Sequence, residues 1–213
     1  MDITWLGHSC FRIKGKEATV VTDPCHPDLG YPLSKLHADI VTVSHAHPGH
    51  SYVDAVEGEF KAVRGPGEYE LKGVFITGIA TFHDKSQGSE RGKNTAYLLE
   101  IDGVTLCHLG DIGHALSSGM EEELGDVGVL LLPIGGVNTI DSSVAAEIVR
   151  SLAPKIVIPM HYKTTALTRE LETLDKFLKK MGLKEIAPQP RFSVNRSTLP
   201  PSTQVVILSY PHQ

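Results

Sequence analysis

The segment that most constrains this chain is a short apolar run that ends in three closely spaced histidines. It reads VTVSHAHPGH, so that a strand-like Val41–Val43 is followed by His45, His47 and His50. Side chains two residues apart on an extended segment point the same way, and Pro48-Gly49 is a turn signal that brings His50 back toward the other two. One histidine is usually a surface or core residue, but three at a strand end predict a metal site.

Three further candidate ligands also follow apolar runs. His83 comes after ITGIATF, Asp111 after TLCHLG, and His161 after IVIPM. In layered α/β folds, sites gather where strands end and loops begin. Taken singly, Asp111 could be a helix cap and His161 a hydrogen-bonded core residue. Together they add a carboxylate and two imidazoles, a donor set that suits zinc first, with manganese or iron as alternatives.

The remaining pattern predicts strands first and helices later. Strands are expected at residues 3–6, 10–13, 19–22, 40–43 and 74–77, in a hairpin over 96–107, and in the continuous apolar runs 127–133 and 156–159. Helices are expected at residues 141–152 after an Asp141 cap, 168–181 after a Thr168 cap, 119–124, and briefly after His50. Because no linker or repeat interrupts this order, we expect residues 1–213 to form a single domain of two packed β-sheets with helices outside.

Composition narrows the classes of function. The 213 residues are 41% hydrophobic and carry a formal net charge of -5, which supports a sizeable core and disfavours broad binding to nucleic acid or anionic lipid. No apolar run approaches the ~20 residues of a membrane span, and the start MDITWLGHSC is not a secretory signal. Three widely spaced cysteines fit a reducing compartment. We therefore expect a cytoplasmic protein without a membrane or nucleic-acid partner, and no feature indicates its oligomeric state.

The order of these motifs resembles the metallo-β-lactamase superfamily. It is most similar to the subgroup that contains ascorbate-6-phosphate lactonase-like and zinc-dependent hydrolase proteins. The supporting motifs are Trp5-Leu6-Gly7-His8-Ser9, Thr22-Asp23-Pro24, Gly65-Pro66-Gly67-Glu68-Tyr69-Glu70, Pro133-Ile134-Gly135-Gly136 and Pro159-Met160-His161-Tyr162. The resemblance implies an α/β fold, a four-layer αββα sandwich of two mixed β-sheets flanked by helices.

The resemblance also implies roles for the candidate residues. It assigns a first metal ion to His45, His47 and His83, a second to His50 and His161, and a bridging position to Asp111, with Asp111 and His161 as the catalytic residues. The family's usual motif is His-x-His-x-Asp-His, and Gly49 stands at the Asp position. We therefore expect a weakened second site, a glycine with positive φ in the turn, and a gain in metal binding from an aspartate at position 49.

Three more residues are candidates for the site. His8, at the end of the first predicted strand, is a candidate supplement to the second metal. Asp23 either holds a ligand histidine in the correct tautomer or is a plain turn residue before Pro24. His114 follows the Asp111 loop and is a candidate substrate contact.

A basic loop lies after His83. Lys85, Arg91 and Lys93 in this loop are either solvated or suited to a phosphate or carboxylate on the substrate.

The resemblance implies a hydrolase that binds one or two zinc ions. A metal lowers the pKa of bound water to about 7, and the metal-bound hydroxide would attack a small ester, lactone or phosphoester, with an anionic small molecule as the expected substrate. One alternative is a metal- or ligand-binding protein whose catalysis is reduced or lost because of Gly49. Another is a nuclease, against which the charge of -5 and the lack of a long basic stretch both weigh.

Overall fold

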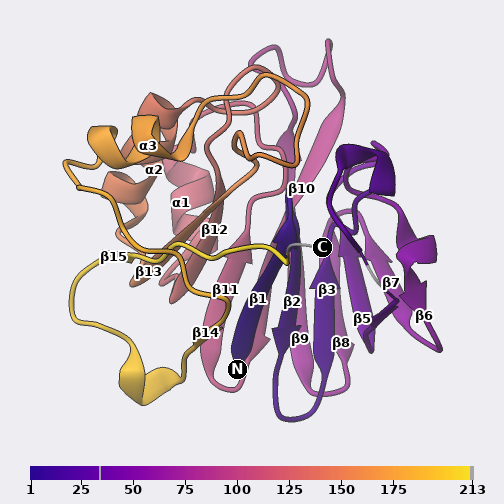
Figure 1. Cartoon of the computed structure of the whole chain (residues 1–213). Coiled ribbons are helices and arrows are strands. Elements are labelled where there is room, and N and C mark those ends of the chain that lie inside the picture. The colour runs from indigo at the N-terminus through magenta and orange to yellow at the C-terminus, as the bar shows by residue number, and fades with distance from the viewer. Residues whose placement is uncertain (34, 212–213) are drawn as a thin grey trace.

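Two large mixed β-sheets form the centre of the computed structural model, which describes residues 1–33 and 35–211 (Figure 1). The first sheet contains, in spatial order, β14 (Phe192–Ser193), β1 (Asp2–Gly7), β2 (Cys10–Lys14), β3 (Thr19–Thr22), β5 (Ile40–Val43) and β7 (Lys61–Arg64). Its β14 to β3 pairings are antiparallel, whereas β3, β5 and β7 run parallel.

The second sheet has the same mixed character. Its spatial order is β15 (Gln204–Val205), β13 (Ile156–Met160), β12 (Val129–Pro133), β11 (Val104–His108), β10 (Lys93–Ile101), β9 (Val74–Phe82) and β8 (Gly67–Leu71). Strands β8 to β11 pair antiparallel, and β11, β12, β13 and β15 pair parallel. A short ribbon of β4 (Leu36–His37) and β6 (Val56–Glu57) lies apart from both sheets.

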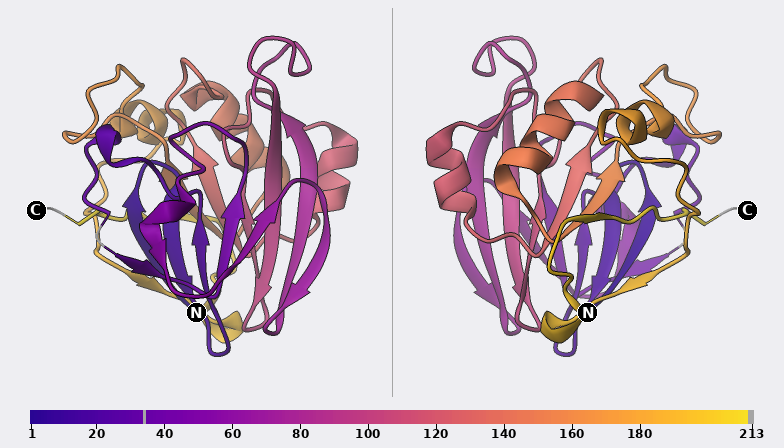
Figure 2. Two further views of the ribbon diagram at one scale, coloured as in Figure 1. Left: turned by 90° about the vertical axis from the view of Figure 1, so that its right-hand side faces the viewer. Right: turned by 90° about the vertical axis from the view of Figure 1, so that its left-hand side faces the viewer.

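The three α-helices of the described residues connect or follow strands of the second sheet. They are α1 (Ser118–Leu124), α2 (Ser142–Leu152) and α3 (Leu174–Lys180), and the 3₁₀ turns are η1 (Pro27–Leu29), η2 (Val53–Ala55) and η3 (Arg196–Thr198). Figure 2 shows α2 and α3 lying along the β12–β13 side of the molecule, while the first-sheet strands occupy the opposite side. Within the described residues, no helix is long and apolar enough to cross a membrane.

An apolar core fills the space between the sheets. The ring centroid of Trp5 lies 6.4 Å from that of Phe11 and 5.1 Å from that of Tyr162. Every residue of β5, β12 and β13 is buried, and for β12 and β13 the continuous apolar runs predicted this burial. The predicted hairpin is present in β10 and β11, with Asp102 and Gly103 at its turn. The predicted mixed two-sheet fold is confirmed.

Two helix predictions are wrong in extent. The helix predicted from Thr168 begins only after Thr173, because the preceding segment is irregular and is tied to other parts of the chain through Glu172. Glu172 donates its N–H to the Gly135 carbonyl, and its carboxylate accepts hydrogen bonds from the N–H and hydroxyl of Ser142. The helix predicted after His50 is a single 3₁₀ turn, η2. The helices predicted at 119–124 and 141–152 are present, and Asp141 caps α2 by accepting from the N–H groups of Ser143 and Val144.

The two sheets are joined by a buried tyrosine. The Tyr97 hydroxyl, on β10, donates to the carbonyl oxygens of Val43 (3.0 Å) and Val63 (3.3 Å) and accepts from the Gly65 N–H. Since Val43 is the last residue of β5, this contact fixes the strand end from which the histidine-rich loop leaves.

We predict that Tyr97→Phe lowers the free energy of unfolding by about 1–3 kcal/mol, because it leaves buried backbone groups without a partner. Urea denaturation measures the change. Tyr69→Phe is the matched control, since that hydroxyl makes only long contacts of 3.3 and 3.4 Å on a turn. Equal losses in the two variants would contradict a special role for Tyr97.

Candidate metal centre

The histidine-rich loop is held at its start by hydrogen bonds to Asp23 and to β10, and it closes on itself further along. Ser44 donates its N–H to Oδ1 of Asp23 (2.8 Å) and its hydroxyl to Oδ2 of the same carboxylate. The Ser44 carbonyl accepts from the N–H of Thr95 on β10. Further along, the His50 N–H donates to the His47 carbonyl (2.9 Å), which closes the turn at Pro48 and Gly49. The loop therefore curls back on itself as the sequence pattern predicted.

One group of potential ligands comes from the loop and from the end of β9. The ligand atoms of His45, His47 and His83 lie within 4.8 Å of one another. Nε2 of His45 is 3.0 Å from Nδ1 of His47, and Nδ1 of His45 is 2.9 Å from the Ser44 hydroxyl. Because Ser44 engages one ring nitrogen of His45, the other is directed toward His47 and the interior of the site.

The Asp111 carboxylate lies at the centre of the cluster. Its Oδ2 is 3.0 Å from Nε2 of His50, 3.3 Å from Nε2 of His161 and 3.5 Å from Nε2 of His83. The Asn94 side chain accepts from the Asp111 N–H (2.9 Å) and so fixes the residue at the end of its strand. Although burial opposes ionisation, the neighbouring His161 and His50 hold the pKa of Asp111 well below its ordinary value.

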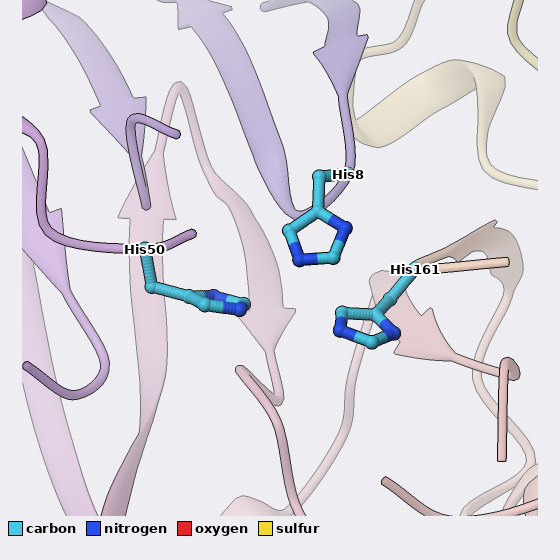
Figure 3. Close-up of side chains that lie close together, drawn as sticks. All are labelled: His8, His50 and His161. Atoms are coloured by element: carbon cyan, nitrogen blue, oxygen red, sulfur yellow. The ribbon is translucent and has the colours of Figure 1, made fainter. Parts of the chain in front are cut away.

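A second group of potential ligands consists of His8, His50 and His161. All three are buried, and their ligand atoms lie within 4.8 Å of one another. Figure 3 shows the three rings around one common space, with His8 entering from the end of β1 and His161 from the end of β13. Both His8 and His161 have positive φ, 52° and 53°, a conformation that is uncommon for residues other than glycine.

Asp23 orients one of these histidines. Its Oδ2 is 2.8 Å from Nδ1 of His50, so Nδ1 carries a hydrogen and Nε2 points to Asp111. Although burial favours the neutral ring, Asp111 and then Asp23 raise the pKa of His50 to about 10 in the absence of metal. Of the two sequence interpretations of Asp23, the contacts support the one in which it sets a histidine tautomer.

The donor set fits a divalent metal. A tetrahedral ion with metal–nitrogen bonds of about 2.0–2.1 Å holds its ligand atoms about 3.3 Å apart, close to the separations of Asp111 Oδ2 from His161 and His83. Among the described residues, Oδ1 of Asp111 is buried without a hydrogen-bond partner. An unpaired buried carboxylate oxygen is costly, and a bound cation would satisfy it.

A cavity of about 390 Å³ opens above the cluster. The residues that line it include Arg91, Asn138, Thr168 and Arg169. Two guanidinium groups beside a metal centre favour a ligand with negative charge.

Asp84 orders the loop that carries Arg91. Its carboxylate accepts from the backbone N–H groups of Ser86, Gly88, Glu90 and Arg91, at distances between 2.8 and 3.1 Å. Those backbone bonds outweigh desolvation and lower the pKa of the Asp84 carboxyl. The loop after His83 is therefore a closed turn built around one carboxylate, and it presents Arg91 to the cavity.

Several sequence candidates lie outside this arrangement. His114 accepts from the Phe82 N–H through Nε2 and contacts the Ala115 carbonyl through Nδ1, and it is not among the described residues that line the cavity. The proposed substrate contact for His114 is therefore not supported. Lys85 lines an adjoining pocket with Arg91, whereas Lys93 belongs to β10.

Sequence reasoning missed several residues of the site. These are Ser44, Asn94, Asn138 and Arg169, which reach the site through contacts between distant segments. For Ser44, the directly following His45 was the only available signal.

We predict that Asp23→Asn weakens zinc binding by about 10- to 100-fold, because the His50 ring loses the partner that orients it. Asn is the suitable replacement since it tolerates the positive φ of 38° at this position. Zinc titration by calorimetry measures the effect. Asp28→Asn, which alters an exposed carboxylate at the same cavity, is the control and should bind zinc as the parent does; equal affinities for all three proteins would contradict the role of Asp23.

Comparison with known proteins places this geometry in a family. The profile of the β-lactamase superfamily domain matches residues 2–161. A UPF0173 metal-dependent hydrolase from Methanoculleus marisnigri is 31% identical over 84% of this chain and 89% of its own, and one from Thermococcus kodakarensis is 30% identical over 77% and 85%.

Solved structures agree with the sequence relatives. A protein from Thermotoga maritima, described as a zinc-dependent hydrolase of the metallo-β-lactamase superfamily, is 37% identical over 99% of both chains with a TM-score of 0.82. Igni18, a metallo hydrolase from Ignicoccus hospitalis, is 25% identical over 91% of this chain and 99% of its own, with a TM-score of 0.65. The chain therefore belongs to the metallo-β-lactamase superfamily and is a metal-dependent hydrolase.

Proposed function

We propose that this hydrolase acts on a small anionic ester, lactone or phosphoester at a centre of two metal ions. The observation that carries the proposal is the position of Asp111. One of its two carboxylate oxygens, Oδ2, lies between 3.0 and 3.9 Å from Nε2 of each of four histidines, which are His45, His50, His83 and His161. One carboxylate within reach of both histidine groups is the arrangement that a bridging ligand requires.

The proposed ligand assignment divides the histidines by the group in which they lie. His45, His47 and His83 would hold one ion, His50 and His161 would hold the other, and Asp111 would contact both. Zinc is the proposed metal, with manganese or iron as alternatives, because imidazole nitrogen and carboxylate oxygen suit all three.

The bound metal would supply a nucleophile at neutral pH by lowering the pKa of coordinated water. The protein's own part is to bind and orient. Asp23 fixes the His50 tautomer, Asn94 fixes Asp111, and Arg91 and Arg169 attract the negative charge of the substrate.

The cavity supports a small substrate. Its volume of about 390 Å³ is near the lower end of the range for small-molecule sites, roughly 300–1,000 Å³. The net charge of -5 favours a small anion over a nucleic acid strand. Three buried free thiols, Cys10, Cys25 and Cys107, are consistent with the reducing cytoplasm that we propose as its location.

We predict that chelation abolishes hydrolysis and that stoichiometric zinc restores it.

Asp111→Asn should lower kcat/KM by at least 100-fold, because the neutral amide supplies no charge to the two cations. His47→Ala should lower the zinc content measured by elemental analysis. Glu122→Gln, a carboxylate on α1, is the control. Full activity after chelation, or in Asp111→Asn, would overturn the proposed centre.

We predict that Arg91→Gln and Arg169→Gln each raise KM for anionic substrates by roughly 10-fold, with little change for neutral esters, since each removes one charge–charge contact. A panel of matched pairs, such as a phosphodiester or carboxylated ester with its neutral methyl ester, provides the measurement. Lys85→Gln, on the same loop, is the control. If both Arg variants lose activity equally on charged and neutral substrates, the arginines do not select charge. Separately, preferential cleavage of RNA oligonucleotides by the parent would favour the nuclease alternative.

A further inference from the structure

The His8 ring lies close to the position that a side chain at residue 49 would occupy. A Cβ atom placed on Gly49 would lie 3.2 Å from Nε2 and 3.4 Å from Cδ2 of the His8 ring. The expectation of a positive φ at Gly49 is wrong, because this residue is not among the left-handed glycines. Backbone conformation therefore does not require glycine at position 49. A Cβ atom at position 49 would instead be in tight contact with the His8 ring, which would have to shift by a few tenths of an ångström to admit it.

The backbone of His8 is held so that its ring enters the site. Its carbonyl accepts from the indole N–H of Trp5 (2.9 Å) and from the N–H of His161 (3.1 Å). The φ of 52° is a strained value for a histidine, and such strain gathers at functional positions. The Trp5 and His161 hydrogen bonds maintain this conformation at the end of β1.

The His8 ring is buried beside two potential ligands. Its centroid lies 4.0 Å from that of His161 and 5.0 Å from that of His50, and the residue is only 3% exposed. Nε2, the ring atom closest to position 49, is the nitrogen available to a metal, whereas Nδ1 is buried without a hydrogen-bond partner among the described residues. In Figure 3 a ring nitrogen of His8 is directed into the space between His50 and His161. A ring that serves only for packing has no need to present a nitrogen there.

We propose that His8 is a ligand of the second metal ion and replaces the carboxylate that Gly49 lacks. The inference rests on the two-metal centre proposed above. The second ion would then be held by His8, His50, His161 and Asp111, which completes four ligands from the protein. Relative to a site with an aspartate at position 49, this set carries one negative charge fewer.

Zinc titration of the whole chain tests the assignment. The parent should bind two zinc ions, and His8→Ala should keep the first while the second binds at least 10-fold more weakly. The double variant His8→Ala/Gly49→Asp should recover the second ion, because removing the ring makes room for the carboxylate. Gly49→Asp alone should bind the second ion no more tightly than the parent, since His8 still fills the space.

His26→Ala is the matched control, a histidine at the same cavity whose Nδ1 accepts from the Asp28 N–H. It should still bind two zinc ions. Two tight ions in His8→Ala, or no recovery in a folded double variant, would overturn the role of His8 and leave the hydrolase proposal intact. A parent that binds no zinc, manganese or iron would instead contradict the metal centre as a whole.

A measurement on the unaltered chain covers the case in which His8→Ala fails to fold. Anomalous diffraction at the zinc edge from zinc-loaded crystals should place Nε2 of His8 within about 2.0–2.3 Å of the second ion. A separation above about 3 Å would show that His8 is not a ligand.

Discussion

The structure depends on one buried carboxylate that must be compensated by positive charge. Asp111 is 3% exposed, and one of its oxygens has no hydrogen-bond partner among the described residues. Asp111 and then Asp23 raise the pKa of the neighbouring His50 to about 10 despite burial, so the two carboxylates strongly favour positive charge at this place. A divalent ion supplies more charge to the same place. Because a histidine binds metal through a deprotonated ring nitrogen, the cluster is suited to exchange protons for a cation.

The topology explains why the ligands come from such distant parts of the sequence. Strands β1, β3 and β5 run in one direction in the first sheet, and β9, β11 and β13 share a direction in the second. Each of these six strands is followed at once by a residue of the site or by the short loop that carries it. Tyr97 joins the sheets at the end of β5, so the two sets of strand ends are held at a fixed separation. Rigid strands thus position the ligands more precisely than flexible loops would.

Strand ends were predictable from sequence because burial gives each strand a continuous apolar signal. The β12 and β13 runs, the hairpin at Asp102 and the capped helix α2 all follow local rules. The candidate ligands were found for the same reason, since each follows the end of an apolar run. The failures involve long-range contacts. Glu172 ties the irregular segment before α3 to Gly135 and Ser142, and no local pattern reveals those partners.

The supporting residues were hidden for a related physical reason. Asn94 lies just before the predicted hairpin at 96–107, and its role arises because β10 begins earlier, at Lys93, and passes beside the Asp111 loop. Asp84 resembles any polar loop residue, yet it accepts four backbone hydrogen bonds and orders the turn that carries Arg91. Arg169, which lines the cavity, lies in a segment that the sequence pattern predicted to be helical and that is not.

The proposed replacement of a carboxylate by His8 would connect metal binding with substrate preference. Exchanging a carboxylate for an imidazole among the ligands would keep their number while raising the net charge of the centre by one. A more positive centre attracts anions more strongly and favours negative charge that develops on a reacting group. Arg91 and Arg169 act in the same direction from the cavity walls. Gly49 stands where the family usually has an aspartate, and in the sequence this looks like a lost ligand. With His8 as the proposed replacement, the change is consistent with a site adapted to anionic substrates.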